Sequence, residues 1–417
     1  MPVTITPPGL RLVEHEFSVP LDHAQPGGEH ITIFAREVAA PSCADDRDAL
    51  ERPFLLFLQG GPGHEAVRPT RHPSAPGWLD RALREFRVLL LDQRGTGRST
   101  PVGALPGRTP AQQAQYLTHF RADSIVRDAE WIRRELDLER WSVLGQSFGG
   151  FCVMCYLSIA PEGLREAFIT GGLPPLGERI DDVYRATYER ALNLGRAYYE
   201  RYPNDRERVR ALHARLKAGD LRLASGDRLT SRRLRQLGAA LGMSAGADTL
   251  HYLLELPADS PAFRHDVDGA LGFARNPLYA ILHESSWADG GRTRWSAQRL
   301  LPADLDTEPE LFTAEHVYPW MFEEYAALAP LREAAELLAE HDWPRLYDPA
   351  RLAANEVPVA AAIYADDLYV PRAFSEQSAA QIRGLRPWLT NELHHDGVRV
   401  EGERVLGRLV DMARGRI

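Results

Sequence analysis

The sequence predicts an α/β fold in which a mostly parallel central sheet carries an inserted helical cap. Short apolar runs alternate with helical patterns in the first and last parts of the chain. The runs are continuously apolar, as is typical of strands that are covered on both faces. Between these parts lies a long stretch of amphipathic helical patterns without a strand pattern. Alternating strands and helices predict parallel pairing, and the helical stretch is predicted to be an insertion between strands.

The first predicted elements are two or three strands in residues 13–38, whose alternating pattern favours antiparallel pairing at a sheet edge. Buried strands follow in PFLLFLQG, FRVLLLDQRG, WSVLGQS and REAFITGGL, with a helix over residues 122–136. Cap helices are predicted in residues 181–202, 230–242, 248–256 and 323–341. VPVAAAIYADD and PWLTNEL are the last strands, each followed by a helix. We therefore expect a core formed by residues 1–177 and 346–417, and a cap formed by residues 178–345.

Composition excludes several classes of function. The net charge of −9 is spread over 417 residues without a block of Lys or Arg, which argues against nucleic acid as a partner. No stretch reaches the roughly 18 apolar residues that a membrane-spanning helix needs, and the first residues lack a secretory pattern. Cys43, Cys152 and Cys155 cannot form a disulfide framework, so we expect a reduced, cytoplasmic protein. No metal-ligand spacing or nucleotide-binding motif is found, so no metal or cofactor is expected.

The segment VLGQSFGG places a serine between glycines, as Gly145, Ser147 and Gly149. It follows an apolar strand and precedes a helical pattern, which is the context that a nucleophile elbow requires. In such a turn the serine is exposed, while glycines on either side avoid collision with the neighbouring backbone. Ser147 is therefore a candidate nucleophile. The alternative is a glycine-rich turn with an inert serine.

A nucleophilic serine needs a histidine base and an acid that orients the base. In this arrangement the acid and then the histidine follow the serine along the chain. Asp366 and Asp367 end one predicted strand, and His394 and His395 follow the next one. The residues alone leave the choice within each pair open. The alternative is surface acids that cap a helix, together with ordinary loop histidines.

The loop FLQGGPG, after the first core strand, is predicted to supply part of an oxyanion hole. Two backbone N–H groups must stabilise the oxyanion in acyl transfer. We assign them to Gly61, with Gly60 as the alternative, and to Phe148, directly after the candidate nucleophile. A simple tight turn is the other interpretation. The strand at 87–92 is expected to lie beside the nucleophile strand. Asp92 at its end, with Arg94 and Arg98 after it, is expected to form a network of ion pairs that holds the glycine-rich loops.

The motifs GGPG, DQRGTGRS and GQSFGG, in this order, resemble those of the proline iminopeptidases of the α/β-hydrolase superfamily. The similarity extends to NPLYAILHE, VYPWMF and TNELHHDGVR and so covers nearly the whole chain. It implies an α/β-hydrolase fold. It favours Asp367, four residues before Pro371, as the acid, and His395, in HDG, as the base.

The resemblance also implies cap glutamates that bind the free amine of the substrate. Glu284 matches one such segment, and Glu315 is a second candidate by approximate position. Trp287, with Tyr318, Trp320 and Phe148, is a candidate for an apolar box around a pyrrolidine ring. The alternative is solvated acids and packing aromatics.

The activity implied is that of a serine exopeptidase that releases N-terminal proline from short peptides through an acyl-enzyme. Two other functions stay open: a broader aminopeptidase or esterase on the same fold, and a catalytically silent binding protein. The sequence does not indicate the oligomeric state.

Overall fold

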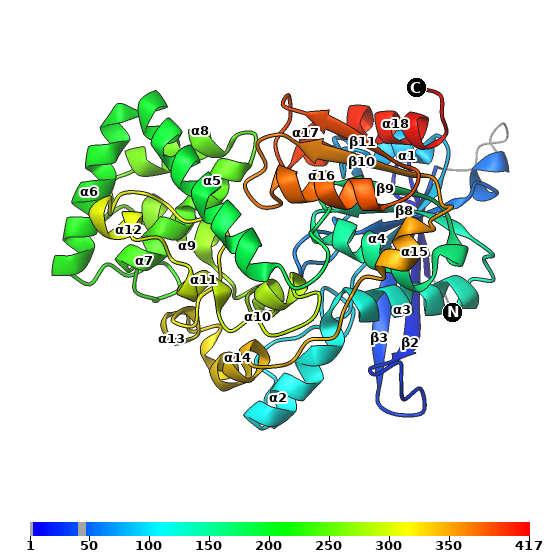
Figure 1. Ribbon diagram of the computed structural model, residues 1–417, viewed down its shortest axis with the longest axis horizontal. Coiled ribbons are helices and arrows are strands. Elements are labelled where there is room, and N and C mark those ends of the chain that lie inside the picture. Colours follow the sequence, from blue (N-terminus) through cyan, green and yellow to red (C-terminus); the bar gives the residue numbers. More distant parts are fainter. Residues whose placement is uncertain (1–2, 41–46) are drawn as a thin grey trace.

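The computed structural model describes residues 3–40 and 47–417, so Cys43 lies outside the described residues. A sheet-based core and a helical cap lie side by side, and both chain ends are on the core (Figure 1). The strands are β1 (Val3–Ile5), β2 (Arg11–Pro20), β3 (His30–Ala39), β4 (Phe54–Leu58), β5 (Thr70–Arg71), β6 (Ser74–Ala75), β7 (Arg87–Leu91), β8 (Trp141–Gln146), β9 (Leu164–Thr170), β10 (Val359–Tyr364) and β11 (Leu385–Thr390).

The central sheet has nine strands in the order β1-β2-β3-β7-β4-β8-β9-β10-β11. The three N-terminal strands are antiparallel and lie at one edge, as predicted, and the strands from β7 onward in this order are parallel. β7 pairs with β3 and β4, and β4 pairs with β8. The prediction that the strand at 87–92 lies beside the nucleophile strand is therefore wrong, because β4 lies between them.

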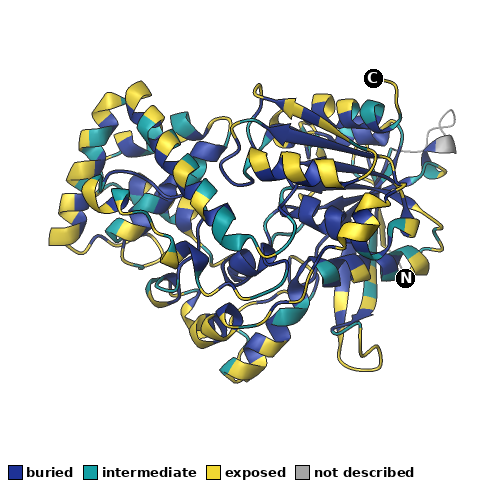
Figure 2. Cartoon of the chain, in the orientation of Figure 1, coloured by how far each residue is buried: buried dark blue, intermediate teal, exposed yellow. Residues whose placement is uncertain are grey.

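Helices cover both faces of the sheet, and its central strands β4, β8 and β10 are wholly buried, while the edge strand β1 is exposed and the edge strand β11 is partly exposed (Figure 2). Alternate side chains of β4 enter two separate apolar clusters, with Leu56 and Leu58 in one and Leu55 and Phe57 in the other. The core helices are α1 (Leu79–Leu83), α2 (Pro110–Leu117), α3 (Ala122–Glu135), α4 (Phe148–Ile159), α15 (Pro349–Ala353), α16 (Arg372–Gln381), α17 (Gly397–Val400) and α18 (Gly402–Ala413). This double covering explains why the core strands are continuously apolar.

The described chain between β9 and β10 forms helices and loops without a strand of the sheet. The cap helices begin at Ile180 and end at Ala339, within the range 178–345 that the sequence predicts for the cap, and α15 follows them before β10. They are α5 (Ile180–Arg201), α6 (Pro203–Ala218), α7 (Ser231–Arg235), α8 (Gly246–Glu255), α9 (Pro261–Leu271), α10 (Pro277–Ser286), α11 (Ser296–Arg299), α12 (Asp304–Thr307), α13 (Met321–Glu324) and α14 (Arg332–Ala339), with the 3-10 helices η4 (Gln236–Gly242) and η5 (Ala329–Leu331).

Two predicted cap helices are broken. The pattern at 323–341 contains Pro330, and the structure ends α13 at Glu324 and begins α14 at Arg332. Proline removes a helical N–H donor and clashes with the preceding turn, which explains this break. The pattern at 230–242 becomes the short α7 followed by η4. Gly238 within η4 approaches another segment so closely that a Cβ there would lie 2.2 Å from the Cβ of Phe312.

Candidate active site

Ser147 lies in a strained turn between β8 and α4, at the end of the sheet where the parallel strands point. Its φ of 55° and ψ of −123° lie in a region that side chains rarely adopt. The turn is held by a 2.9 Å hydrogen bond from the Ser147 N–H to the Thr170 carbonyl. A Cβ at Gly149 would lie 1.9 Å from the carbonyl oxygen of Leu58, and one at Gly145 would lie 2.3 Å from that of Gly149. Glycine is therefore required on both sides of the serine.

His395 and Asp367 are in direct contact. Nδ1 of His395 donates to Oδ2 of Asp367 over 2.8 Å, and both side chains are buried. The other carboxylate oxygen accepts hydrogen bonds from the backbone N–H groups of Tyr369 at 2.9 Å and Val370 at 3.0 Å. Because both oxygens are bonded, the carboxylate has one orientation, and it fixes the proton of the imidazole on Nδ1.

Asp366 and His394, the other candidates for the acid and the base, do not take part in this contact. Asp366 is exposed and forms an ion pair with Arg190 of α5. His394 is partly exposed, and its carbonyl accepts a 2.9 Å hydrogen bond from the N–H of Gly397 in a turn. The structure thus brings together Asp367 and His395, the members that the resemblance favours.

The surroundings of His395 stabilise its protonated form. Burial lowers the pKa of His395, but the charge and hydrogen bond of Asp367 and the charge of Glu315 raise it more strongly. The nearby cation of Arg399 offsets part of this effect. The net pKa lies above the ordinary 6.5. An imidazole in this position accepts a proton readily and is stabilised once it has done so.

Ser147 and His395 both lie close to Gly171 and Gly172, the two glycines that follow β9. A Cβ at Gly171 would lie 3.1 Å from Nδ1 of His395, and one at Gly172 would lie 2.3 Å from the carbonyl oxygen of Ser147. Within the described residues no hydrogen bond joins the side chains of Ser147 and His395. Such bonds are often long without substrate and shorten in the substrate complex.

The glycine-rich loop after β4 runs beside Ser147. A Cβ at Gly60 would lie 3.1 Å from the Cβ of Ser147. The φ of Gly61 is +142°, a conformation that other residues rarely adopt. Phe148 is the first residue of α4, so its N–H has no partner within the helix. The predicted oxyanion donors, Gly61 and Phe148, therefore belong to two segments that flank the serine.

The charged residues after β7 form ion pairs, but in separate groups rather than in the single network that the sequence predicts, and the Arg98 guanidinium pairs with Glu14 and Glu16 of β2. Asp92 is fully buried and accepts two hydrogen bonds from Arg68, at 2.7 and 2.8 Å, and one from the N–H of Arg98 at 3.0 Å. Arg94 is buried against Asp128, with Nε 2.7 Å from one carboxylate oxygen. The sequence did not reveal the partners Arg68 and Asp128, which lie in other segments. The Asp92–Arg68 pair joins the turn after β7 to the segment that follows the glycine-rich loop.

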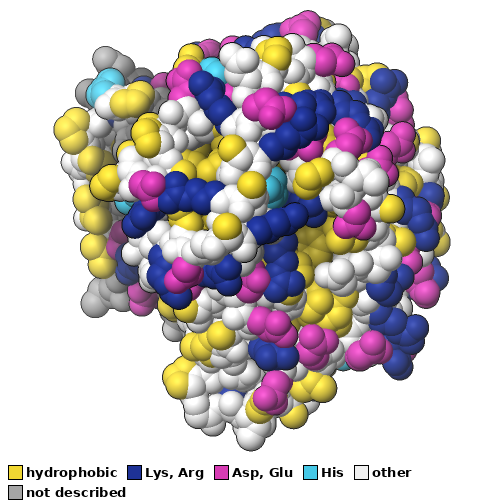
Figure 3. Space-filling view, turned by 90° about the vertical axis from the view of Figure 1, so that its left-hand side faces the viewer, with side chains coloured by type: hydrophobic (Ala, Val, Ile, Leu, Met, Phe, Trp, Pro, Cys, Tyr) yellow, Lys and Arg dark blue, Asp and Glu magenta, His cyan; other side chains and the backbone are white. Residues whose placement is uncertain are grey.

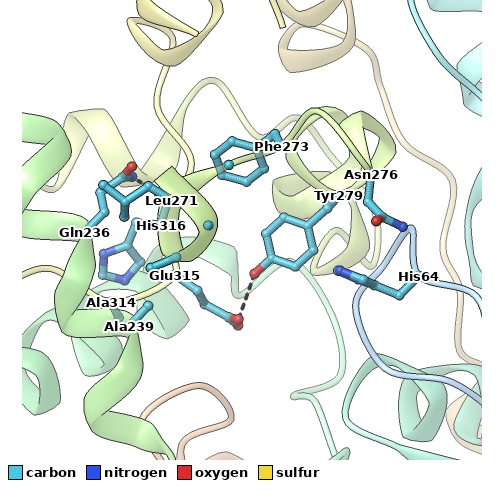
Figure 4. A pocket seen from close by; sticks show the side chains of 13 residues that line it. His64, Gln236, Ala239, Leu271, Phe273, Asn276, Tyr279, Ala314, Glu315 and His316 are labelled. Carbon is cyan, nitrogen blue, oxygen red and sulfur yellow. Dashed lines mark hydrogen bonds between the residues drawn. The ribbon is translucent and has the colours of Figure 1, made fainter. Parts of the chain in front are cut away.

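A cavity of about 300 Å³, which we call the outer pocket, opens between the cap and the glycine-rich loop. Figure 4 shows Tyr279 of α10 between Glu315 and His64, with its hydroxyl donating to the Glu315 carboxylate over 2.8 Å. Phe273 and the backbone from Gly269 to Gly272 form another part of the wall. The outer pocket therefore joins core and cap residues around one carboxylate.

A much smaller cavity of about 10 Å³, the inner pocket, shares Glu315 with the outer pocket. Its lining includes Trp287, Tyr184 and His283 from the cap and Tyr369 from the core. Tyr369 packs against the His395 imidazole with ring centroids 4.6 Å apart. The inner pocket is thus an aromatic space beside the acid–base pair, with a carboxylate in its wall.

Known proteins align with this chain along almost its full length. A family profile for the alpha/beta hydrolase fold matches residues 53–324. A proline iminopeptidase of Aeromonas sobria is 48% identical over 420 aligned residues, which cover 97% of each chain. The proline iminopeptidase aneH of Aspergillus aculeatus is 35% identical, with 99% of this chain and 95% of that protein aligned.

The chain belongs to the proline iminopeptidase family of α/β hydrolases. The resemblance seen in the sequence is confirmed, and so is the fold class. The members of this family at high coverage align with both the core and the cap, so the cap is part of the shared chain rather than an addition to it.

Two of the three predicted cap residues of this family member line the pockets. Glu315 belongs to both pockets, and its side chain is 28% exposed. Burial raises the pKa of Glu315, but His283, His395 and the Tyr279 hydroxyl lower it more, so its pKa lies below the ordinary 4.5. Trp287 lines the inner pocket. Tyr318 and Trp320 stack on each other and line neither pocket.

Glu284 faces the cap interior rather than either pocket. Its Oε1 accepts a 2.9 Å hydrogen bond from the N–H of Ala297, and it is 6% exposed. Its Oε2 is buried without a hydrogen-bond partner in the described chain. Burial raises the pKa of Glu284 to about 7, although bonds from Ala297, Thr293 and Ser296 oppose the shift.

Sequence reasoning missed several residues of the site, and His64, Tyr279, His283 and Tyr369 are four of them. Two of them adjoin recognised motifs, since His64 directly follows GGPG and Tyr369 lies two residues after Asp367. The other two lie on α10, one helical turn apart and in the same segment as Glu284. A search within four residues of each motif would have found them.

The structure also bears on partners. In the ranges that it describes, no group of three or more His, Cys, Asp or Glu side chains could hold a metal ion, and no helix is long and apolar enough to cross a membrane. Cys152 and Cys155 are buried free thiols. Acidic and basic side chains are mixed over the cap end of the molecule (Figure 3).

Proposed function

We propose that this protein releases N-terminal proline from peptides by serine catalysis with Ser147, His395 and Asp367. The observation that carries the proposal is the buried Asp367–His395 pair beside the strained serine turn. Membership of the proline iminopeptidase family supports the substrate class. The Glu315 carboxylate in an aromatic pocket next to His395 supports a substrate with a free amine.

In this mechanism the Ser147 hydroxyl attacks the carbonyl carbon of the N-terminal residue. His395 takes the hydroxyl proton on Nε2 as the new C–O bond forms. Asp367 holds the imidazole in the tautomer that leaves Nε2 free, and it stabilises the imidazolium. His395 then gives the proton to the leaving amine as the peptide bond breaks. Water then attacks the acyl carbon while His395 takes its proton, and His395 returns that proton to the Ser147 oxygen as the acyl–serine bond breaks, which releases proline and restores the serine.

Backbone N–H groups of Gly61 and Phe148 would bind the oxyanion of each tetrahedral intermediate. Removing one donor of this kind costs about 10²–10³-fold in kcat. Gly61 needs its positive φ to present its N–H from the loop, and Phe148 presents its N–H at the start of α4. The partial positive charge of the α4 N-terminus favours the same oxyanion.

Substrate selection would depend on where the positively charged N-terminal amine of the peptide binds. A protonated amine in the inner pocket meets the ionised carboxylate of Glu315, and a charge-assisted hydrogen bond forms. The inner pocket has a volume of only about 10 Å³, so Trp287 and Tyr369 would have to move apart for the pyrrolidine ring to pack between them. The rest of the peptide would extend through the outer pocket past Tyr279 and His64. An N-acylated peptide lacks the charge and would bind poorly.

A panel of aminoacyl 4-nitroanilides and 4-nitrophenyl esters tests this function. We expect proline 4-nitroanilide to have the highest kcat/KM among the amides and N-acetylproline 4-nitroanilide to be nearly inert. Preference for another amide would support the broader aminopeptidase, and much faster ester turnover would support the esterase. No turnover, together with no labelling of Ser147 by a fluorophosphonate, would support the silent binding protein.

Peptides are the only partners that this proposal requires. A cytoplasmic location also remains a proposal, which the buried thiols of Cys152 and Cys155 support because reducing compartments preserve free thiols.

A further inference from the structure

The cap touches the core through residues that adjoin the acid and the base. Tyr369, two residues after Asp367, donates its hydroxyl to the carbonyl of Ala239 in η4. Asp396, directly after His395, accepts hydrogen bonds from Ser244, at 3.0 Å from the N–H and 2.6 Å from the hydroxyl. Both cap partners belong to one segment, residues 236–244, which we call the docking segment.

Tyr369 is the residue at which these contacts meet. Its N–H donates to Asp367 over 2.9 Å, and its ring packs on the His395 imidazole with centroids 4.6 Å apart. Its ring also lines the inner pocket, and its hydroxyl reaches Ala239 in the docking segment. One side chain therefore contacts the base and the cap, while its backbone holds the acid.

The fit between Tyr369 and the docking segment is close. A Cβ at Gly242 would lie 2.4 Å from the Tyr369 ring, so only glycine leaves room for the ring at this distance. Tyr369 is 4% exposed, and burial raises the pKa of its hydroxyl well above the ordinary 10.0. The hydroxyl therefore stays protonated and remains a donor at neutral pH. A further link between cap and core, the ion pair of Asp366 with Arg190, is solvent-exposed and contributes little.

We propose that Tyr369 is a positioning residue that couples docking of cap segment 236–244 to the alignment of Asp367 and His395. The inference rests on the proposed function, because it assumes that these two residues act as acid and base. A shift of about 1 Å in a catalytic group can cost about 100-fold in rate. A cap contact that restrains both groups therefore contributes to kcat. The Tyr369 hydroxyl makes this contact with Ala239 and does not touch the reacting atoms.

The first test compares Tyr369→Phe with Tyr199→Phe. Tyr199 is a matched control, because it is also 4% exposed and also donates its hydroxyl to a backbone carbonyl, that of Glu310, at 2.7 Å within the cap. We expect Tyr369→Phe to lower kcat for proline 4-nitroanilide by about tenfold or more, with KM changed by less than about threefold because the ring remains. Tyr199→Phe should keep the wild-type kcat.

The rate of Ser147 labelling by a fluorophosphonate gives a readout that a merely structural role would not change. This reaction needs His395 as base but makes little use of the amine-binding pocket. We expect slower labelling of Tyr369→Phe than of Tyr199→Phe at equal melting temperature. Equal kcat and equal labelling rates in the two variants would overturn the proposal.

A second pair of variants keeps the test decisive if Tyr369→Phe does not fold. Ser244→Ala removes the hydroxyl that binds Asp396. Ser225 is its control, since its N–H and hydroxyl likewise donate to a single aspartate, Asp268, at 2.7 and 2.9 Å on the cap surface. We expect Ser244→Ala, but not Ser225→Ala, to lower kcat and the labelling rate by about threefold or more. Equal values would count against the coupling.

Wild-type protein in the same assays separates this inference from the proposed function. If the wild type does not hydrolyse proline 4-nitroanilide, the proposed function is wrong. If it does and all four variants match it, the function stands and the coupling through Tyr369 is wrong.

Discussion

Nδ1 of His395 lies 2.8 Å from Oδ2 of Asp367, and both groups are buried. A histidine held in this way keeps its proton on Nδ1, so only Nε2 is free to act as the base. The contact therefore leads directly to predictions about the acid, the base and the pH dependence of catalysis.

Asp367→Asn should lower kcat by about 10⁴-fold, because an amide at this position favours the wrong imidazole tautomer. Asp366→Asn is the matched control: it changes the adjacent, exposed residue and loses only the ion pair with Arg190. It should retain kcat within about threefold, since exposed ion pairs contribute little. Steady-state kinetics on proline 4-nitroanilide measures both effects. A larger loss in Asp366→Asn would reverse the assignment.

The pH dependence of kcat should have an acidic limb centred above pH 6.5. Catalysis requires neutral His395, and its pKa is raised above 6.5 because Asp367 and Glu315 outweigh the effect of burial. Activity should therefore rise as the pH increases through this pKa. Glu315→Gln removes one of the two negative charges, so its limb should move to lower pH. A limb that stays in place would show that Glu315 does not act on His395.

Glu315→Gln should also raise KM for proline 4-nitroanilide by tenfold or more, because a charge-assisted hydrogen bond to the amine contributes about 1.5–3 kcal/mol. KM for an uncharged ester substrate should change little. Glu310→Gln is unsuitable as a control because Glu310 is fully buried and pairs with two arginines. Glu207→Gln, an exposed glutamate on α6, serves instead. An equal rise in KM for charged and uncharged substrates would remove Glu315 from amine binding.

Glu284→Gln should change the pH dependence of stability. The pKa of Glu284 is raised from 4.5 to about 7 in the folded protein, so the folded state holds a proton that the unfolded chain has released. Stability is then lost as the pH rises from about 4.5 to 7, by roughly 3 kcal/mol. Melting temperatures across this range should show the variant gaining on the wild type as the pH increases. A constant difference would mean that Glu284 is already ionised near pH 5.

The order of the motifs made the core of the site predictable. The strand–serine–helix pattern around Ser147 and the later positions of the acids and histidines follow from a parallel sheet whose strands end at one edge. The local sequence could not separate Asp367 from Asp366, because adjacent residues after a strand differ only in which one turns inward. Burial in the folded chain makes that distinction.

The cap was less predictable. The helix α10 is buried on nearly all sides, so its sequence gives no polar face from which the direction of Glu284 could be read. The carboxylate that reaches the pockets is Glu315, which lies in an irregular segment without a helical or strand period. The place of β7 was mispredicted because chain order does not fix strand order: β4 lies between β7 and β8.

Peptide mapping by mass spectrometry after fluorophosphonate treatment tests the central claim most directly. The account predicts a single adduct on Ser147, formed in step with the loss of proline 4-nitroanilide hydrolysis, and no adduct in Ser147→Ala. An adduct on another residue, or full hydrolysis by Ser147→Ala, would contradict it.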